Sequence, residues 1–207
     1  MLRSVRELEK CRVTAADGAQ VGRIKDVYFD DQTWTIKHLV LSVEPRTFVL
    51  KQVLIDPRQV LFSENTGVIR LNIAFSAVQD SPLAASVLPV CHQYAALAYA
   101  SPGSGQFARG LGASDPHLRS ARAVAHYRIN AGGEFGGTLA DFIFDSAEWL
   151  VRYLAVEQII ERRKLLFHVL PQSVERFTWA SQRILLRSLQ PVLLEMSESA
   201  ERNMAAA

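Results

Sequence analysis

The sequence is poor in features that mark several large classes of protein. Its 207 residues contain only two cysteines, and 23 Lys and Arg are balanced by 21 Asp and Glu. Two thiols are too few for a disulfide framework, and neither Cys11 nor Cys91 lies in a Cys-x-x-Cys pair. A formal net charge of +2 argues against a protein that binds mainly through phosphate contacts. We expect two reduced thiols in a cytosolic protein.

Long hydrophobic runs are also missing. The longest stretch of small apolar residues, 95–100, is far shorter than the ~20 residues needed to cross a bilayer. The first ten residues alternate charged and apolar side chains, so we expect no secretory signal there. The chain is nevertheless 49% hydrophobic and 21% charged, which is the composition of a globular protein and excludes wholesale disorder.

Signatures of catalysis are absent as well. The five histidines are scattered, and none has a metal-ligand spacing or a nucleophile motif nearby. The glycine-rich stretch 101–105 lacks the Lys-Ser/Thr of a phosphate-binding loop. We therefore expect no catalytic residue, no cofactor and no metal ligand.

What the sequence does contain is an internal repeat. Residues 2–6, Leu-Arg-Ser-Val-Arg, match residues 118–122, Leu-Arg-Ser-Ala-Arg. The offset between the copies changes by one residue within 15–20, a turn-like stretch, and exposed loops tolerate such changes. The identical pairs that define the repeat are Gly22/Gly137, Asp26/Asp141, Phe29/Phe144, Asp30/Asp145 and Trp34/Trp149. We infer a duplicated unit.

Each copy is predicted to fold as short β-strands. Asp17-Gly18 and Gly132-Gly133 are hairpin turn dipeptides between apolar-rich runs. The expected strands are 10–14, 21–29, 34–43, 48–55 and 68–73 in the first copy, with a closing segment from Val60, and 149–157, 164–169 and 183–189 in the second. So many short strands in about 70 residues favour a small closed barrel, because closure removes exposed edges.

The predicted fold class is all-β with minor helix, as two tandem small β-barrels related by pseudo-two-fold symmetry. The first barrel spans 1–75, a helical connection and Gly/Ser/Pro-rich linker 76–117, the second barrel 118–190, and a helical or frayed tail 191–207. We expect the barrels to pack together, because a chain of under ~90 residues buries only roughly 60% of its unfolded surface.

The motifs of the repeat resemble those of the PRC-barrel family. In the first copy these are the turn Asp17–Gly22, the strands Ile24–Asp30 and Trp34–Val40, and the strand exit Val53–Pro57. The second copy departs from the pattern, since it lacks the turn aspartate and has Ala140 where the first has Lys25. The resemblance implies PRC-type barrels like the cytoplasmic domain of the photosynthetic reaction-centre H subunit or the C-terminal half of the ribosome maturation factor.

This resemblance implies a docking platform, because such proteins share a fold and serve different partners. We expect a non-catalytic, cytoplasmic binding or adaptor protein, peripheral on the inner face of a membrane complex. A ribosome- or RNA-associated assembly factor and a small-ligand- or metal-responsive regulator are the alternatives. The protein partner is unidentified, nucleic acid is disfavoured, and a homodimer stays open.

Two aspartate pairs are the first candidate for chemistry. Asp26 and Asp30 lie four apart on a strand, so both side chains point to one side, and Asp141 and Asp145 repeat this. They either bind a cation or relay protons, or they cap the next turn and accept structural hydrogen bonds. We favour the structural role, because a metal site requires more than two oxygen ligands.

Each of the remaining candidate residues can also have either a structural or a functional role. Trp34 and Trp149 are binding anchors or, as we favour, barrel-filling side chains. Gly22 and Gly137 permit a turn or a close backbone approach. The basic cluster Arg162, Arg163 and Lys164 contacts a polyanion or, as we favour, is solvated charge at a turn. The apolar run that follows it, 165–167, covers the first barrel or binds another chain.

Overall fold

The structure is a computed structural model that describes residues 1–43, 51–62, 67–93, 115–188 and 191–192. The chain forms two compact units. Unit 1 comprises Met1–His126 and Asp141–Arg152, and unit 2 comprises Tyr127–Ala140 and Tyr153–Ala207. Strands dominate the described residues and helices are short, which confirms the expected all-β class with minor helix.

The order of elements is the same in the two halves of the sequence. The first half contains β1 (Leu2–Ser4), α1 (Val5–Lys10), β2 (Arg12–Thr14), β3 (Gln20–Asp30), β4 (Ile36–Val43), β5 (Lys51–Ile55), η1 (Pro57–Gln59), β6 (Val60–Phe62) and β7 (Val68–Leu71). The second contains β8 (Leu118–Ser120), α5 (Ala121–Val124), β9 (Arg128–Ala131), β10 (Glu134–Asp145), β11 (Leu150–Ile160), β12 (Arg163–Val169), η3 (Pro171–Ser173), β13 (Val174–Thr178) and β14 (Arg183–Leu186). The sequence repeat is thus also a repeat of secondary structure.

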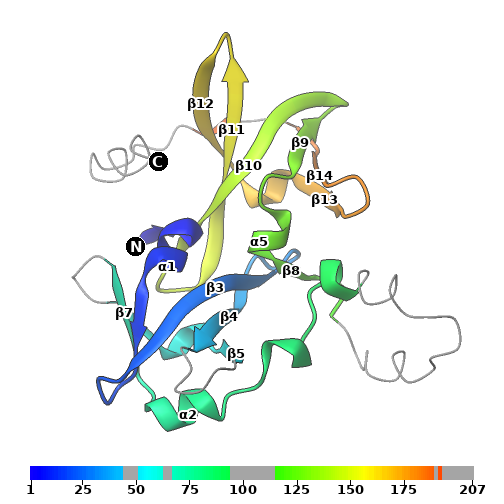
Figure 1. The fold of residues 1–207 in the computed structure, drawn as a ribbon. Helices are drawn as coiled ribbons and strands as arrows, with labels where there is room; N and C mark the ends of the chain where they lie inside the picture. The colour runs from blue at the N-terminus through cyan, green and yellow to red at the C-terminus, as the bar shows by residue number, and fades with distance from the viewer. Residues whose placement is uncertain (44–50, 63–66, 94–114, 189–190, 193–207) are drawn as a thin grey trace, which may run out of the picture. The chain divides into compact units, whose positions relative to one another are not determined.

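The strand order within the two sheets repeats too. It runs β5-β4-β3-β2-β7-β6 in the first sheet and β12-β11-β10-β9-β14-β13 in the second. The pairs β2–β7 and β9–β14 are parallel, whereas the hairpin neighbours are antiparallel. Both sheets are curled, as expected of two β-barrel modules (Figure 1).

The first strand of each copy pairs with the sheet of the other copy. β1 is antiparallel to β10, with Leu2 opposite Asp145, and β8 is antiparallel to β3, with Leu118 opposite Asp30. The exchange is reciprocal, and it explains why the compact units do not follow the repeat. Whether 1–75 and 118–190 are separate domains stays a prediction.

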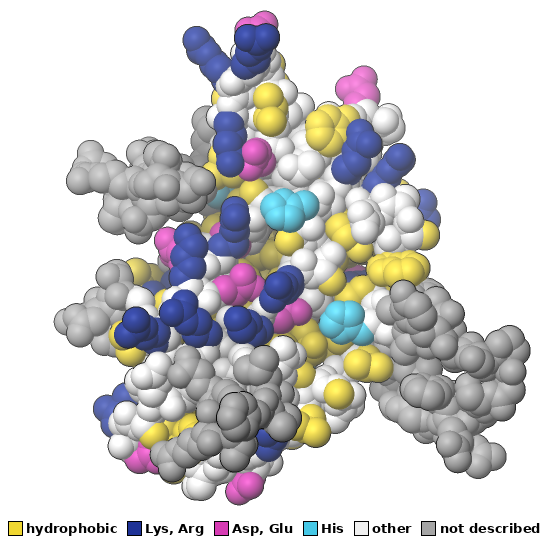
Figure 2. All heavy atoms as spheres, viewed as in Figure 1, with side chains coloured by type: hydrophobic (Ala, Val, Ile, Leu, Met, Phe, Trp, Pro, Cys, Tyr) yellow, Lys and Arg dark blue, Asp and Glu magenta, His cyan; other side chains and the backbone are white. Residues whose placement is uncertain are grey.

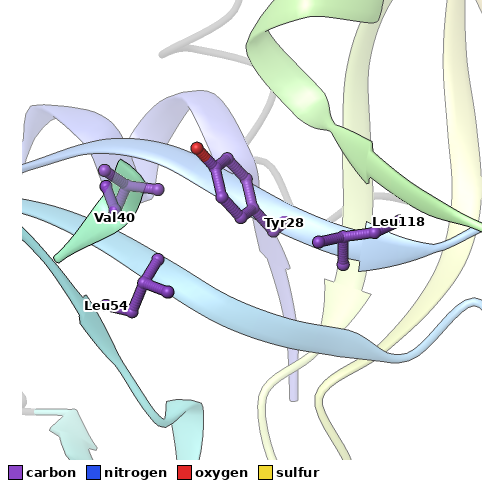
Figure 3. Packing of buried hydrophobic residues seen from close by; sticks show 5 residues of the cluster. Tyr28, Val40, Leu54 and Leu118 are labelled. Atoms are coloured by element: carbon purple, nitrogen blue, oxygen red, sulfur yellow. The ribbon is translucent and has the colours of Figure 1, made fainter. Parts of the chain in front are cut away.

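Both faces of the central strands in unit 1 are buried. Ile24, Leu39 and Leu41 lie on one face of the first sheet and are at most 3% exposed. On the other face, Tyr28, Val40 and Leu54 pack with Leu118 of β8 (Figure 3) and with Ala84. A strand covered on both faces needs no polar alternation, which explains the nearly continuous apolar run of β4.

The described part of the connection, expected over 76–117, contains short helical elements. Its described elements are α2 (Phe75–Gln79), η2 (Ala84–Ser86) and helical residues at 90–93, while residues 94–114 lie outside the described part. Between α2 and η2 the chain runs along β5, where the Leu54 N–H donates to the Pro82 carbonyl at 2.8 Å.

Several element boundaries differ from those predicted. The strand expected over 10–14 starts at Arg12 because Lys10 ends α1, and β4 starts at Ile36 because Trp34 belongs to a turn. The start of the expected strand 48–55 lies outside the described residues. The tail predicted as helical or frayed over 191–207 starts with the strand β15 (Pro191–Val192), which pairs with β12, and the rest of the tail, 193–207, lies outside the described residues. Among the described residues, no helix has the length and apolarity required to span a bilayer.

Candidate functional site

Asp26 fixes the start of α5 to the middle of β3. Its Oδ2 accepts a hydrogen bond from Ser120 Oγ at 2.5 Å, and its Oδ1 accepts from the Arg122 N–H at 3.0 Å and the Val27 N–H at 2.7 Å. Ser120 is the N-cap of α5 and its Oγ also accepts from the Ala123 N–H at 2.9 Å. One buried carboxylate thus satisfies three donors, two of which come from the other copy.

Asp141, in the second copy, makes the equivalent contacts with α1 of the first copy. It accepts hydrogen bonds from Ser4 Oγ, from the Arg6 N–H at 3.2 Å and from the Phe142 N–H at 2.7 Å. Ser4 is the N-cap of α1, and its Oγ accepts from the Glu7 N–H at 3.1 Å. We call the pairs Ser120–Asp26 and Ser4–Asp141 the exchanged Ser–Asp contacts.

A third carboxylate in unit 1, that of Glu9 in α1, is electrostatically coupled to both aspartates. Partial burial, together with the charges of Asp26 and Asp141, raises the pKa of Glu9 to about 7, while the charges of Arg122 and Arg6 oppose the shift. Burial also raises the pKa of Asp26 and of Asp141, although their hydrogen bonds act in the opposite sense. Glu9 is therefore a group that titrates near neutral pH.

Asp30 and Asp145 organise the turns that follow β3 and β10. Asp30 Oδ1 accepts from the Gln32 and Thr33 N–H groups at 2.9 and 2.8 Å. Asp145 Oδ1 accepts from the Ala147 N–H at 2.8 Å and from the N-terminal ammonium at 3.2 Å, and these bonds lower the pKa of Asp145. The two aspartates are thus engaged in structural hydrogen bonds. No group of three or more His, Cys, Asp or Glu in the described ranges is placed to hold a metal ion.

The two tryptophans close these turns and are buried. Their backbone N–H groups donate to the backbone carbonyls of Asp30 and Asp145 at 2.8 and 2.7 Å. Both tryptophans have a positive φ, 60° for Trp34 and 54° for Trp149. Trp34 is 8% and Trp149 6% exposed. The rings stack on Phe29 and Phe144 with centroids 5.8 and 5.2 Å apart. A positive φ is costly for a bulky residue, so the stacking and turn contacts must hold it.

The backbones of the two tryptophan turns also pair with each other. The Ile36 N–H donates to the Trp149 carbonyl, and the Val151 N–H donates to the Trp34 carbonyl, both at 2.8 Å.

Gly137 lies at a close approach of two backbone segments in unit 2, since a Cβ there would be 2.6 Å from the Glu157 carbonyl oxygen. Gly22 has a φ of 150° and lies opposite Val43.

The basic cluster lies at the end of the β11–β12 hairpin. Glu161 and Arg162 form its turn with positive φ values of 50° and 65°, and Arg163 and Lys164 begin β12. Lys164 Nζ is 2.8 Å from Glu157 Oε2. Figure 2 shows basic side chains at this end of the hairpin, with hydrophobic side chains beside them. The cluster is charged surface at a turn, combined with exposed apolar surface.

The structure links some candidate residues and leaves others apart. The charges of Asp26 and Asp141 both act on Glu9, and Phe29, which stacks on Trp34, contacts Phe142 at a centroid distance of 4.9 Å. Arg162–Lys164 belong to unit 2. Sequence reasoning missed Ser4, Ser120 and Glu9. The sequence Ser4-Val-Arg-Glu7 is a capping signature that could have identified α1.

Comparison with protein families supports the resemblance for the first copy. Residues 2–71 match the family model of the PRC-barrel domain. The match begins with β1 and ends with β7, so it covers the whole set of first-copy strands. No curated protein matches the chain.

Proposed function

We propose that the protein is a non-catalytic binding or adaptor protein built on two PRC-barrel modules, acting in the cytoplasm at the inner face of a membrane complex. The observation that carries the proposal is the structural use of the repeated aspartates. Asp26 and Asp141 each accept two hydrogen bonds from the exchanged segment, and Asp30 and Asp145 cap turns. These carboxylates hold backbone segments in place through hydrogen bonds, and a rigid structure of this kind suits a docking scaffold.

We extend the family to the second copy, although the family model matches only residues 2–71. What supports this is the identical order of strands and the recurrence of the same contacts at equivalent residues. Asp141 repeats the bonds of Asp26, and Trp149 repeats the turn and stacking of Trp34. A PRC-barrel domain by itself suggests a general binding role, and the membrane location rests on the analogy with the H subunit.

Affinity capture of the full chain from its native cells tests the proposal, with membrane and soluble fractions kept apart. We expect a protein partner in near-stoichiometric amount from the membrane fraction, retained after nuclease treatment and in ~0.5 M salt, where the Debye length falls below ~5 Å. No protein retained above an empty-matrix control in either fraction would contradict the adaptor role.

An RNA-associated role is the second candidate, and the exposed Arg162, Arg163 and Lys164 favour it. If it is correct, captured RNA dissociates as salt rises, and replacing all three residues with Ala lowers the log–log salt slope by about 2–3. Nuclease-resistant capture that the triple variant leaves unchanged would exclude this alternative. A ligand-responsive regulator would instead show a specific rise in melting temperature with one added ligand.

A further inference from the structure

Exposed apolar side chains are concentrated on the β11–β12 hairpin. Ile159 and Ile160 are 71% and 45% exposed, and Leu165 and Leu166 are 46% and 37% exposed. Ile159 is opposite Lys164, Gln158 is opposite Leu165 and Glu157 is opposite Leu166. Because side chains alternate between faces, Ile160 and Leu165 lie on one face and Ile159 and Leu166 on the other. The end of the hairpin thus presents apolar surface on both sides.

The outer edge of β12 is open next to this surface. β11 pairs with one side of β12 along its whole length, whereas β15 pairs on the other side only with His168 and Val169. In the part of the chain that the structure describes, no strand pairs with that side of 163–167. An open strand edge with apolar side chains is a template for another strand, and proteins usually protect it.

The first copy shows what protection of the equivalent edge looks like. There, α2 and the segment after it lie along β5, with Lys51 Nζ donating to the Gln79 carbonyl and the Leu54 N–H to the Pro82 carbonyl. The chain between β7 and Pro82 spans 72–81, but between β14 and Pro191 it spans only 187–190. Among the residues that the structure describes after β14, none forms a counterpart of α2 on this edge.

The side chains on β12 are also more apolar than those at the equivalent positions of β5. The register of the hairpins makes Leu165 and Leu166 the counterparts of Lys51 and Gln52. The second copy thus has leucines where the first copy has polar residues, on a strand that no described helix covers. Apolar side chains on an edge that the described residues leave uncovered favour pairing with another molecule.

We propose that this cover is a second copy of the chain, with β12 pairing antiparallel to the partner's β12 about a two-fold axis at Leu165. In this register Leu165 lies opposite the partner's Leu165, and Lys164 lies opposite the partner's Leu166. Arg163 lies opposite the partner's Phe167. No two like charges face each other, and each cross-strand pair contains a large apolar side chain, so the strand is complementary to itself.

The basic turns do not prevent this pairing. The two-fold register points them in opposite directions, and the two Arg163 residues are about 14 Å apart along the strands at ~3.4 Å per residue, beyond the Debye length of ~10 Å at 0.1 M salt. Arg163 beside an aromatic ring is a contact type that the protein already uses. Arg3 lies 4.0 Å from the Phe62 centroid and Arg128 5.0 Å from that of Phe135.

Sedimentation equilibrium of the full chain over about 1–200 µM tests the proposal, since a short edge interface makes an association that depends on concentration. We expect the average mass to approach twice the monomer value. Leu165→Lys and Leu165→Glu each place a charge opposite itself, so each variant alone should stay monomeric. An equimolar mixture should dimerise again, with an apparent affinity at least tenfold above that of either variant alone.

The matched control is Leu61→Lys, which changes a 50% exposed leucine on β6 in unit 1 and should leave the dimer unchanged. Unchanged circular dichroism and unfolding midpoints show that the variants are folded. A monomer at every concentration, a Leu165→Lys variant that still dimerises, or a mixture that stays monomeric overturns the proposal. A foreign protein bound to a monomeric chain through Leu165 also overturns it, while leaving the adaptor role intact.

Discussion

The carboxylate of Glu9 is subject to opposing electrostatic effects. It is on α1, near enough to Asp26 and Asp141 to feel both charges, and near enough to Arg6 and Arg122 to be partly compensated. Asp26 is buried and Asp141 is partly buried, and both accept hydrogen bonds. Ionising all three carboxylates brings like charges together in a region of low polarity, so a proton on Glu9 stabilises the fold.

This gives a pH dependence with a definite sign. The pKa of Glu9 is about 7 in the folded protein and 4.5 in the reference state, so its protonated form is favoured by folding. The stabilisation is fully present below about pH 4.5 and is lost as pH rises through 7. We expect Glu9→Gln to be more stable than the wild type at pH 8 by on the order of 1–2 kcal/mol, after discounting for partial exposure.

Urea unfolding of both proteins from pH 5 to 8 measures this difference. The variant's advantage should shrink as pH falls, and Glu7→Gln on the exposed side of the same helix should show no such trend. A wild type that is equally stable relative to Glu9→Gln at all these pH values would show that Glu9 does not titrate in this window.

The tryptophans are a second residue-scale test. Trp34→Ala and Trp149→Ala should each lower the free energy of unfolding by ~3–5 kcal/mol, because each removes a buried ring that stacks on a phenylalanine. Chemical denaturation gives the number. Loss of partner binding with stability unchanged would instead identify them as contact residues.

At the scale of elements, turns and strands could be predicted and the short helices could not. The Asp-x-x-x-Trp turns and the strands around Gly22 and Gly137 follow from turn chemistry and apolar runs. α1 and α5 are too short to show a helical period, and contacts with β3 and β10 hold them. The start of β4 at Ile36 was missed because a positive φ at Trp34 goes against the preference of its residue type.

The exchange of first strands could not be predicted from the sequence, because the sequences of the two copies are alike at these positions. Leu-Arg-Ser occurs at both 2–4 and 118–120, and the strands they join, β10 and β3, carry the same Asp-x-x-Phe-Asp sequence. Either first strand is chemically compatible with either sheet. Only the path of the chain through three dimensions decides between the pairings.

The close approach at Gly137 is testable within one hairpin. Gly137→Ala brings a Cβ to 2.6 Å from the Glu157 carbonyl at a φ of 130°, so we expect a loss of roughly 2–3 kcal/mol. Gly133→Ala is the matched control, because φ is 89° there and the space is open, and it should cost about 1 kcal/mol. Equal losses in thermal or urea unfolding would mean that backbone strain alone, and not the contact with β11, requires glycine at 137.

At the scale of the whole molecule, unit 1 needs both copies of the repeat. β8 and α5 complete the sheet and satisfy Asp26, while β10 accepts β1 and satisfies Ser4. We therefore expect a chain split after residue 105 to give two halves that are poorly folded alone and that assemble when coexpressed. Far-UV circular dichroism and co-purification check this. Two halves that unfold cooperatively by themselves would show that the exchange is dispensable.

The exchange itself is tested most directly by double-mutant cycles on the exchanged Ser–Asp contacts. Ser4→Ala with Asp141→Ala, and Ser120→Ala with Asp26→Ala, should show coupling free energies of about 1–3 kcal/mol in urea unfolding, because each pair shares a hydrogen bond that is partly buried for Ser4–Asp141 and buried for Ser120–Asp26. The same-copy combinations, Ser4 with Asp26 and Ser120 with Asp141, should be additive within ~0.5 kcal/mol. Coupling within a copy and additivity between copies would contradict the reciprocal exchange on which this account of the fold rests.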